Sequence, residues 1–120
     1  MNDVPRTVLV VDDHPSFRAT ARALLEAEGF SVIGEAVDGE EALAKTVELH
    51  PDFVLLDIQL PDIDGFEVAR RLLARNAEVK IVLVSSRDRD AYGSAIEESG
   101  ALGFIWKGEL SGVALEGFLG

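Results

Sequence analysis

Five short apolar runs alternate along the chain with longer segments in which apolar residues recur three or four positions apart. Short runs rich in Val, Ile and Leu are typical of strands that are buried on both faces of a parallel sheet. The expected strands are Val8–Val11, Ser31–Glu35, Phe53–Asp57, Lys80–Val84 and Leu102–Trp106. The alternation therefore predicts an α/β fold built on five parallel strands.

The segments between these runs carry the start and stop signals of helices. Pro15 suits a first helical turn, Asp64 is a suitable N-cap, and Pro51 forces a break before the third strand. We expect helices from Pro15 to Gly29, Gly39 to His50, Phe66 to Leu73, Arg89 to Ser99 and Leu110 to Leu119. The last is weakly specified, because each interior glycine costs about 1 kcal/mol relative to alanine. Gly112, Gly117 and Gly120 are the glycines concerned.

Composition narrows the class of protein. The chain has 120 residues, the size of one domain, and lacks an apolar stretch of the ~20 residues that span a bilayer. Its 22 acidic and 11 basic residues give a formal charge of −11, which repels nucleic acid and anionic lipid. We expect no direct nucleic-acid binding by this domain and no membrane partner. No cysteine is present, so disulfides and thiolate metal sites are excluded. Residues 1–7 lack the apolar core of a secretory signal, which favours a cytoplasmic location.

Polar side chains follow four of the five predicted strands. Asp12 and Asp13 follow the first, Asp57 ends the third, Ser85 follows the fourth and Lys107 follows the fifth. Ligands of open α/β sheets bind beyond the carboxyl ends of the strands, where these residues should converge. The pattern predicts one site with three carboxylates, a hydroxyl and an ammonium.

These residue types suit phosphate chemistry. Asp12, Asp13 and Asp57 form an all-oxygen set of the kind that Mg²⁺ prefers. A metal ion offsets the repulsion between a carboxylate and a phosphoryl group, so Asp57 is a credible nucleophile. Lys107 supplies a positive charge and Ser85 a donor for phosphoryl oxygens. Taken singly, each residue could instead be an ordinary cap, turn or strand-end residue.

The motifs resemble the receiver domain of two-component response regulators. The matching segments are Val10–Pro15, Leu55–Asp57 with Pro61 and Gly65, Val84–Ser86 and Phe104–Lys107. The resemblance spans residues 1–120 and implies a flavodoxin-like (βα)5 three-layer sandwich with strand order 2-1-3-4-5. It also implies that a sensor histidine kinase phosphorylates Asp57. The implied Mg²⁺ ligands are Asp12, Asp13, Asp57 and the backbone carbonyl of Gln59.

The resemblance further implies a conformational switch. Ser85 and Phe104 match the family's hydroxyl and aromatic switch positions, which change the surface of the fourth helix, fifth strand and fifth helix. Gln59 and Arg87 match positions that tune the lifetime of the phosphoryl group. We expect Trp106 to pack or to form an interface on the side of Phe104, and we expect phosphorylation to favour a homodimer through that face. Such a domain is not a turnover enzyme, although it catalyses its own phosphorylation and dephosphorylation.

The stretch Asp12-Asp13-His14-Pro15 resembles receivers that carry a helix-turn-helix output domain. In those receivers the histidine lies behind the metal ligands, so we expect no catalytic role for His14. No output domain is present in the 120 residues. We therefore expect the chain to be the amino-terminal piece of a longer regulator of transcription, with DNA bound through that missing domain.

Two other classes of protein stay open. A receiver-like interaction domain that works without phosphorylation would keep the fold but not need the complete residue set. A Mg²⁺-dependent phosphohydrolase of the haloacid dehalogenase type would also place an aspartate after an apolar strand. That enzyme needs a second acid two residues later, and the chain has Gln59 there.

Overall fold

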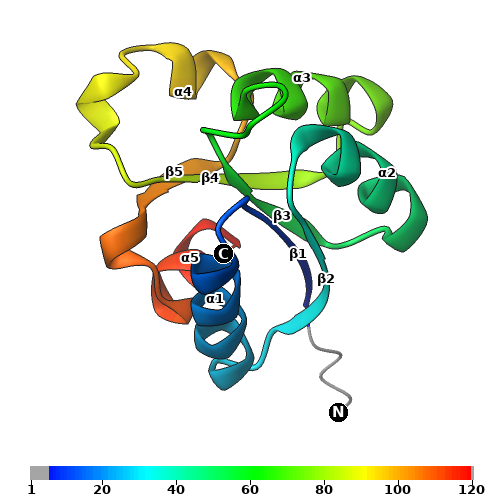
Figure 1. The fold of residues 1–120 in the computed structure, drawn as a ribbon, viewed down its shortest axis with the longest axis vertical. Coiled ribbons are helices and arrows are strands. Elements are labelled where there is room, and N and C mark those ends of the chain that lie inside the picture. Colours follow the sequence, from blue (N-terminus) through cyan, green and yellow to red (C-terminus); the bar gives the residue numbers. More distant parts are fainter. Residues whose placement is uncertain (1–5, 120) are drawn as a thin grey trace.

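Five parallel strands form one twisted sheet in the order β2-β1-β3-β4-β5 (Figure 1). They are β1 (Thr7–Val11), β2 (Ser31–Ala36), β3 (Phe53–Asp57), β4 (Lys80–Ser85) and β5 (Gly103–Trp106). The architecture comes from a computed structural model that describes residues 6–119. It confirms the predicted flavodoxin-like fold and strand order, and each predicted strand end lies within one residue of the observed one.

Helices cover both faces of the sheet, so the fold has three layers (Figure 1). They are α1 (Pro15–Ala27), α2 (Gly39–Leu49), α3 (Gly65–Arg75), α4 (Ala95–Glu98) and α5 (Gly112–Leu119), with 3-10 turns η1 (Arg89–Ala91) and η2 (Lys107–Glu109). On one face lie α1 and α5, and on the other lie α2, α3 and α4.

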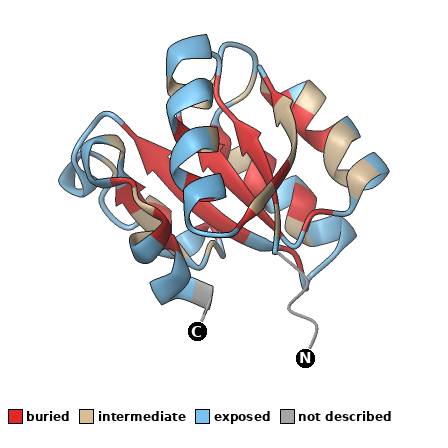
Figure 2. Cartoon of the chain, turned by 90° about the horizontal axis from the view of Figure 1, so that it is seen from below, coloured by how far each residue is buried: buried red, intermediate tan, exposed pale blue. Residues whose placement is uncertain are grey.

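Two apolar cores hold the layers together, one on each face of the sheet. Successive residues of a strand point to opposite faces, so Leu9 joins the core under α2 and α3 while Val10 joins the core under α1 and α5. All five residues of β3 are buried, as expected for the central strand (Figure 2). Each fully buried Val, Leu or Phe side chain contributes roughly 1.5–3 kcal/mol to folding.

Aspartate side chains cap the starts of α2 and α3. The carboxylate of Asp64 accepts the N–H of Glu67 at the start of α3, which confirms the N-cap predicted from the sequence. Asp38 caps α2 in the same way, by accepting the N–H of Glu41. These caps satisfy backbone N–H groups that have no partner within the helix.

Gly65 lets the start of α3 lie directly against the end of β3. Its N–H donates to the carbonyl of Ile58 at 2.7 Å. A Cβ at Gly65 would stand 2.4 Å from the carbonyl oxygen of Asp57 and 2.7 Å from Cα of Ile58. Both are backbone atoms that cannot move aside, so only glycine fits. This contact sets the position of the loop that follows Asp57.

The prediction of one helix from Arg89 to Ser99 is wrong. The segment forms η1 and the four-residue α4, separated by Tyr92, Gly93 and Ser94. Gly93 has a φ of +57°, a left-handed conformation that interrupts a right-handed helix. The carboxylate of Asp88 also accepts the N–H of Asp90, which closes a separate local turn.

The last helix starts two residues later than predicted. Leu110 is extended and buried, and the Ser111 hydroxyl accepts the N–H of Ala114 as a cap. The helix therefore begins at Gly112, while Gly120 lies outside the described residues.

Two sequence expectations concern the chain's relation to membranes. No helix within residues 6–119 combines the length and the apolar character that crossing a bilayer requires. The prediction that residues 1–7 carry no secretory signal falls mostly on residues 1–5, which lie outside the described residues.

Candidate functional site

The predicted residues gather at the carboxyl edge of the sheet. Asp57 pairs in register with Val84, the residue before Ser85, and Ser85 pairs with Trp106, the residue before Lys107. Asp12 directly follows β1, the strand on the other side of β3. Neighbouring parallel strands that end at one level thus carry the four side chains to a common edge.

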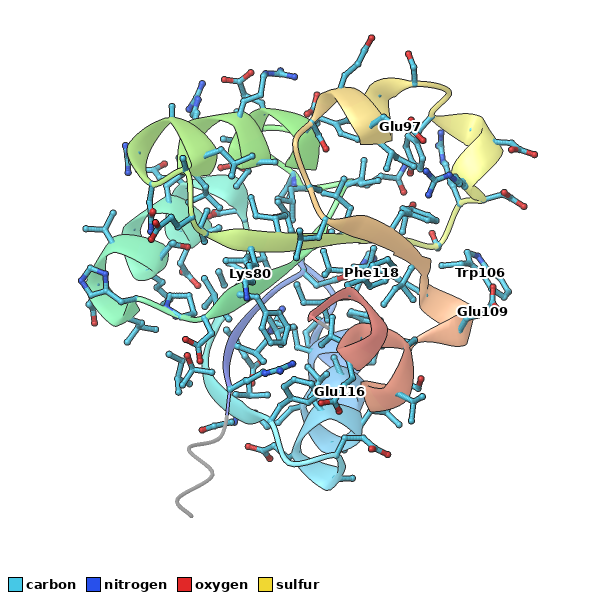
Figure 3. All side chains as sticks on the ribbon, turned by 180° about the vertical axis from the view of Figure 1, so that it is seen from behind. Lys80, Glu97, Trp106, Glu109, Glu116 and Phe118 are labelled. Atoms are coloured by element: carbon cyan, nitrogen blue, oxygen red, sulfur yellow. The ribbon has the colours of Figure 1, made fainter. Side chains whose placement is uncertain are left out.

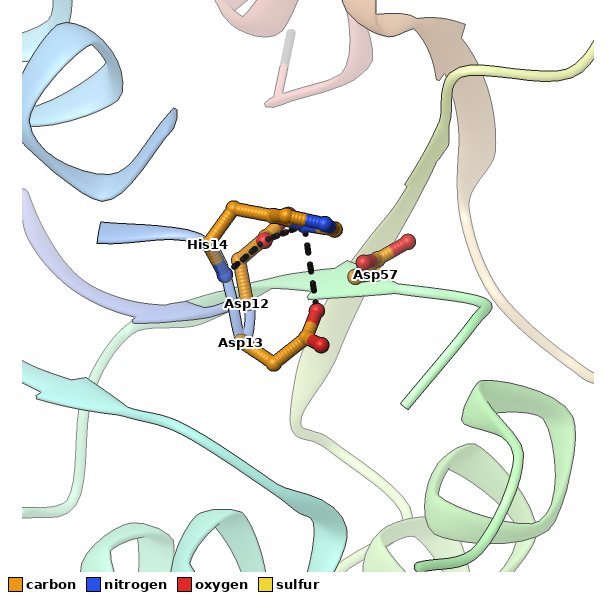
Figure 4. Close-up of side chains that lie close together, drawn as sticks. All are labelled: Asp12, Asp13, His14 and Asp57. Carbon is orange, nitrogen blue, oxygen red and sulfur yellow. Dashed lines mark hydrogen bonds and ion pairs between the residues drawn. The ribbon is translucent and has the colours of Figure 1, made fainter. Parts of the chain in front are cut away.

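Acidic groups form the centre of this site (Figure 4). One side-chain donor atom from each of Asp12, Asp13, His14 and Asp57 lies within 4.8 Å of all the others. The side chain of Asp12 is fully buried and Asp57 is 2% exposed, whereas Asp13 is exposed at the rim. Two carboxylates are thus removed from water beside each other.

Lys107 lies between the two buried carboxylates. Its Nζ is 2.6 Å from Oδ2 of Asp12 and 3.3 Å from Oδ2 of Asp57. The ammonium group also sits 4.5 Å from the centroid of the Phe17 ring, a cation–π contact from α1. One positive charge therefore serves two buried negative charges, and the shorter contact is with Asp12.

This imbalance of charge changes the acidity of Asp57. Burial and then the neighbouring Asp12 carboxylate raise the pKa of the Asp57 carboxyl to about 6, from an ordinary value of 3.8. Lys107 and the N–H of Gln59, which donates to Oδ1 at 3.1 Å, oppose the rise. The site is short of positive charge even with Lys107 in place.

The donor set fits a small divalent cation. Oδ2 of Asp12 is buried and accepts no hydrogen bond of good geometry, although Lys107 Nζ is close enough for an ion pair. Asp13 and Asp57 add further carboxylate oxygens within the same few ångströms. Oxygen ligands with excess negative charge are what Mg²⁺ prefers.

His14 lies closer to the acids than the sequence indicated. Its Nδ1 is 3.0 Å from Oδ1 of Asp12 and 3.1 Å from Oδ1 of Asp13 (Figure 4). Its backbone N–H also donates to Oδ1 of Asp12 at 2.8 Å. The histidine thus contacts both carboxylates directly, which is compatible with the expected supporting position behind the metal ligands, and the absence of a catalytic role stays a prediction.

Ser85 is held by partners that the sequence did not reveal. Its hydroxyl is buried, accepts the N–H of Arg87 at 3.0 Å and lies 2.5 Å from the hydroxyl of Tyr92. Tyr92 is the only tyrosine of the chain, which was a signal available in the sequence. Its role was missed because the surrounding segment reads as a regular helix.

Phe104 and Trp106 lie on the surface formed by η1, β5 and α5. The half-buried ring of Phe104 packs 6.2 Å from that of Tyr92, between centroids. Trp106 is 45% exposed, and its Nε1–H donates to the carbonyl of Ser86 at 3.0 Å. Figure 3 shows Trp106 beside Glu109 at the end of β5. Both rings line a groove of about 610 Å³ that reaches Phe118.

Gln59 and Arg87 flank the site. The side chains of both residues are exposed. The backbone N–H of Gln59 donates to Asp57, and that of Arg87 donates to Ser85. Neither the metal-ligand role of the Gln59 carbonyl nor the lifetime-tuning role of these two positions is tested by these contacts. Both roles stay predictions.

The structure is thus a doubly wound parallel sheet with two buried aspartates and a lysine at its carboxyl edge. The family model of the response regulator receiver domain matches residues 8–112. The chain belongs to this family, as its motifs predicted.

The curated relatives include proteins named as a response regulator and as a transcription regulator. The chain is 41% identical over 102 residues to the response regulator GacA of Pseudomonas viridiflava, covering 84% of this chain and 48% of GacA. It is 38% identical over 102 residues to BvgA of Bordetella pertussis, which is named as a transcription regulator of virulence factors, covering 85% and 49%. The chain thus spans about half the length of the curated relatives it matches.

Solved structures share the fold. A two-component response regulator of the LuxR family from an Aurantimonas species superposes with a TM-score of 0.85 at 30% identity, covering 95% of this chain and 81% of that chain. The response regulator TrrA of Thermotoga maritima, solved in complex with Mg²⁺ and beryllium fluoride, has a TM-score of 0.77 at 34% identity, covering 84% and 85%.

Proposed function

We propose that this receiver domain accepts a phosphoryl group on Asp57 from a sensor histidine kinase and thereby controls an output. The observation that carries the proposal is the buried Asp57 carboxylate, with Lys107 3.3 Å away and Asp12 bound to the same ammonium. Buried carboxylates at a sheet edge with a shared cation are costly for stability alone, which favours a chemical role.

The transfer itself is a simple displacement. An oxygen of Asp57 forms a bond to phosphorus while the bond from phosphorus to the leaving group breaks, and the leaving group keeps the electron pair. Lys107 offsets charge on the phosphoryl oxygens, and the Ser85 hydroxyl can donate to one of them. Mg²⁺, held by Asp12, Asp13 and Asp57 with the carbonyl of Gln59 as a proposed further ligand, would supply charge neutralisation between carboxylate and phosphoryl group.

The phosphoryl group is removed by hydrolysis, in which a water oxygen forms a bond to phosphorus while the bond from phosphorus to the Asp57 oxygen breaks and the carboxylate keeps the electron pair. The backbone N–H groups of Gln59 and Arg87 donate to Asp57 and Ser85, and both side chains are exposed beside the site. We assign to them an influence on phosphoryl lifetime. The domain then catalyses its own phosphorylation and dephosphorylation without an external turnover substrate.

The output is proposed from the relatives. GacA and BvgA are about twice as long as the matched region and are named as regulators, so DNA binding would belong to a separate output domain. A formal charge of −11 agrees with a domain that does not bind DNA itself. The kinase, the cytoplasmic location and transcriptional control are parts of this proposal.

The alternatives have less support. An interaction domain that works without phosphorylation has no need of two buried carboxylates around one ammonium. A phosphohydrolase of the haloacid dehalogenase type needs an acid two residues after Asp57, and Gln59 cannot donate or accept a proton in that way.

Phosphorylation can be tested directly with a small donor. Incubation with acetyl phosphate and Mg²⁺ should add one phosphoryl group, seen as a gain in intact mass. Asp57→Asn should lose the gain completely, because an amide is not a nucleophile, and a chelator should suppress it in the wild type. Asp90→Asn, which changes an exposed acid on η1, is the matched control and should retain it. An unchanged wild-type mass would contradict the proposal.

Self-association is proposed through the face that carries the groove. Trp106 and Phe118 are 45% and 36% exposed, and large exposed aromatic side chains are enriched at interfaces. Phosphorylation, or beryllium fluoride with Mg²⁺, should shift the sedimenting species from monomer to dimer, and Trp106→Ala should weaken the dimer. Equal monomer masses with and without the phosphoryl analogue would count against the dimer.

A further inference from the structure

Tyr92 connects the phosphate site to the segment between η1 and α4. Its hydroxyl lies 2.5 Å from the buried Ser85 hydroxyl, and its ring packs between Phe66 and Phe104, with centroid distances of 5.6 and 6.2 Å. The residue thus has one polar contact to the site and two aromatic contacts to its surroundings. Phe104 has no hydroxyl, so the phenol of this region comes from Tyr92 alone.

The contacts of Ser85 limit what its hydroxyl can do. A serine hydroxyl has one hydrogen to donate and two acceptor positions. Arg87 N–H already occupies one acceptor position at 3.0 Å, and Tyr92 takes part in a second bond. A phosphoryl oxygen is only an acceptor, so it must receive the single Ser85 hydrogen. With Ser85 as the donor to the phenolic oxygen of Tyr92, a phosphoryl group and Tyr92 compete for this single hydrogen.

We propose that Tyr92 is a positioning residue that holds the Ser85 hydroxyl in the unphosphorylated domain and must release it when phosphate binds at Asp57. The inference rests on the proposed function and extends it to a residue outside the switch pair of Ser85 and Phe104. Release frees the phenol from the sheet edge, so occupancy of the site is passed to the segment that bears Tyr92.

The local structure around Tyr92 suits such a release. Its neighbours η1 and α4 have three and four residues, and Gly93 beside it adopts a φ of +57°. Short helical pieces have few backbone hydrogen bonds to lose when they move. The Ser85–Tyr92 bond is one of the contacts that hold this segment in place, beside the packing of the Tyr92 ring and of the buried Ile96.

Removing the phenolic oxygen tests the competition. Tyr92→Phe keeps the ring and its packing but leaves Ser85 free. Calorimetric titration with beryllium fluoride and Mg²⁺ should show roughly threefold to tenfold tighter binding, the equivalent of one net hydrogen bond. In a Ser85→Ala background the same substitution should have no effect. Ser86→Ala, which alters the adjacent exposed serine, is the control and should bind the analogue with the affinity of the wild type.

A second measurement follows Tyr92 itself. Because the chain has one tyrosine, labelling the hydroxyl-bearing ring carbon with ¹³C yields a single NMR signal. This signal should move when the analogue binds the wild type. In Ser85→Ala it should already stand near the released position before the analogue is added.

The outcomes separate the inference from the proposed function. Three results would each overturn the role of Tyr92: equal or weaker analogue binding by Tyr92→Phe, tightening that persists in the Ser85→Ala background, or an NMR signal that does not move. If the wild type still binds the analogue normally, the proposed phosphorylation of Asp57 is unaffected by these results. A wild type that takes up neither the analogue nor a phosphoryl group contradicts both.

Discussion

Lys107→Met is expected to lower the free energy of unfolding by about 3 kcal/mol at about pH 8 without Mg²⁺, the size of loss seen when one partner of a buried ion pair is removed. The ammonium is the cation within 3.3 Å of both Asp12 and Asp57, and those two carboxylates are buried. Methionine keeps most of the aliphatic stem, so the loss measures the missing charge. Chemical denaturation followed by circular dichroism gives the free energies.

Mg²⁺ should stabilise Lys107→Met more than it stabilises the wild type, so the difference in stability between the two proteins should shrink. A ligand that binds only the folded state stabilises it by mass action, and the carboxylates of the variant no longer share an ammonium with the ion. Lys80→Met is the control, because Lys80 is exposed at the start of β4, where a change within about 0.5 kcal/mol is expected. Equally small losses in both variants would show that the charge of Lys107 contributes little to the stability of the fold.

The fold was predictable because its strands are buried on both faces. A central strand such as β3, with all five residues buried, has to be an unbroken apolar run, and Pro51 before it marks its start. The same runs place Asp57 and Ser85 at strand ends. Strand order follows from the family resemblance, and the structure confirms it.

The segment after β4 was not predictable in the same way. Arg89, Asp90 and Ala91 are compatible with a helix, and the sequence does not show that Tyr92 bonds to Ser85, seven residues earlier. That tertiary contact and the left-handed Gly93 override the local preference. The error in secondary structure and the missed residue thus have one cause.

Within the site, residue types were predictable and orientations were not. Adjacent acids after a strand point different ways, but only the structure shows that Asp12 is buried while Asp13 is exposed. The distances of 2.6 and 3.3 Å likewise assign Lys107 more closely to Asp12 than to Asp57. Such choices depend on loop paths that local sequence does not determine.

Asp57→Asn is expected to stabilise the Mg²⁺-free domain by about 2–3 kcal/mol at about pH 8, while abolishing phosphorylation. The pKa of Asp57 is raised from 3.8 to about 6 in the folded domain, chiefly by burial and then by Asp12. The folded state thus binds this proton more tightly than the unfolded chain. The contribution of Asp57 to stability therefore falls as pH rises from about 4 through 6. Above that range the full destabilisation from the ionised carboxylate is present.

Asparagine carries no charge to desolvate, so Asp57→Asn should lack this fall, and the two proteins should converge in stability near pH 4. Its side-chain oxygen can still accept the N–H of Gln59, which keeps the local loop geometry. Denaturation midpoints measured from about pH 4 to 8 with a chelator present test the difference, with Asp90→Asn expected to follow the wild type. Parallel pH curves for the wild type and Asp57→Asn would show that burial of Asp57 places no charge penalty on the fold. Stability thus opposes an ionised aspartate at this position even with Lys107 3.3 Å away, and the proposed phosphoryl transfer accounts for its presence.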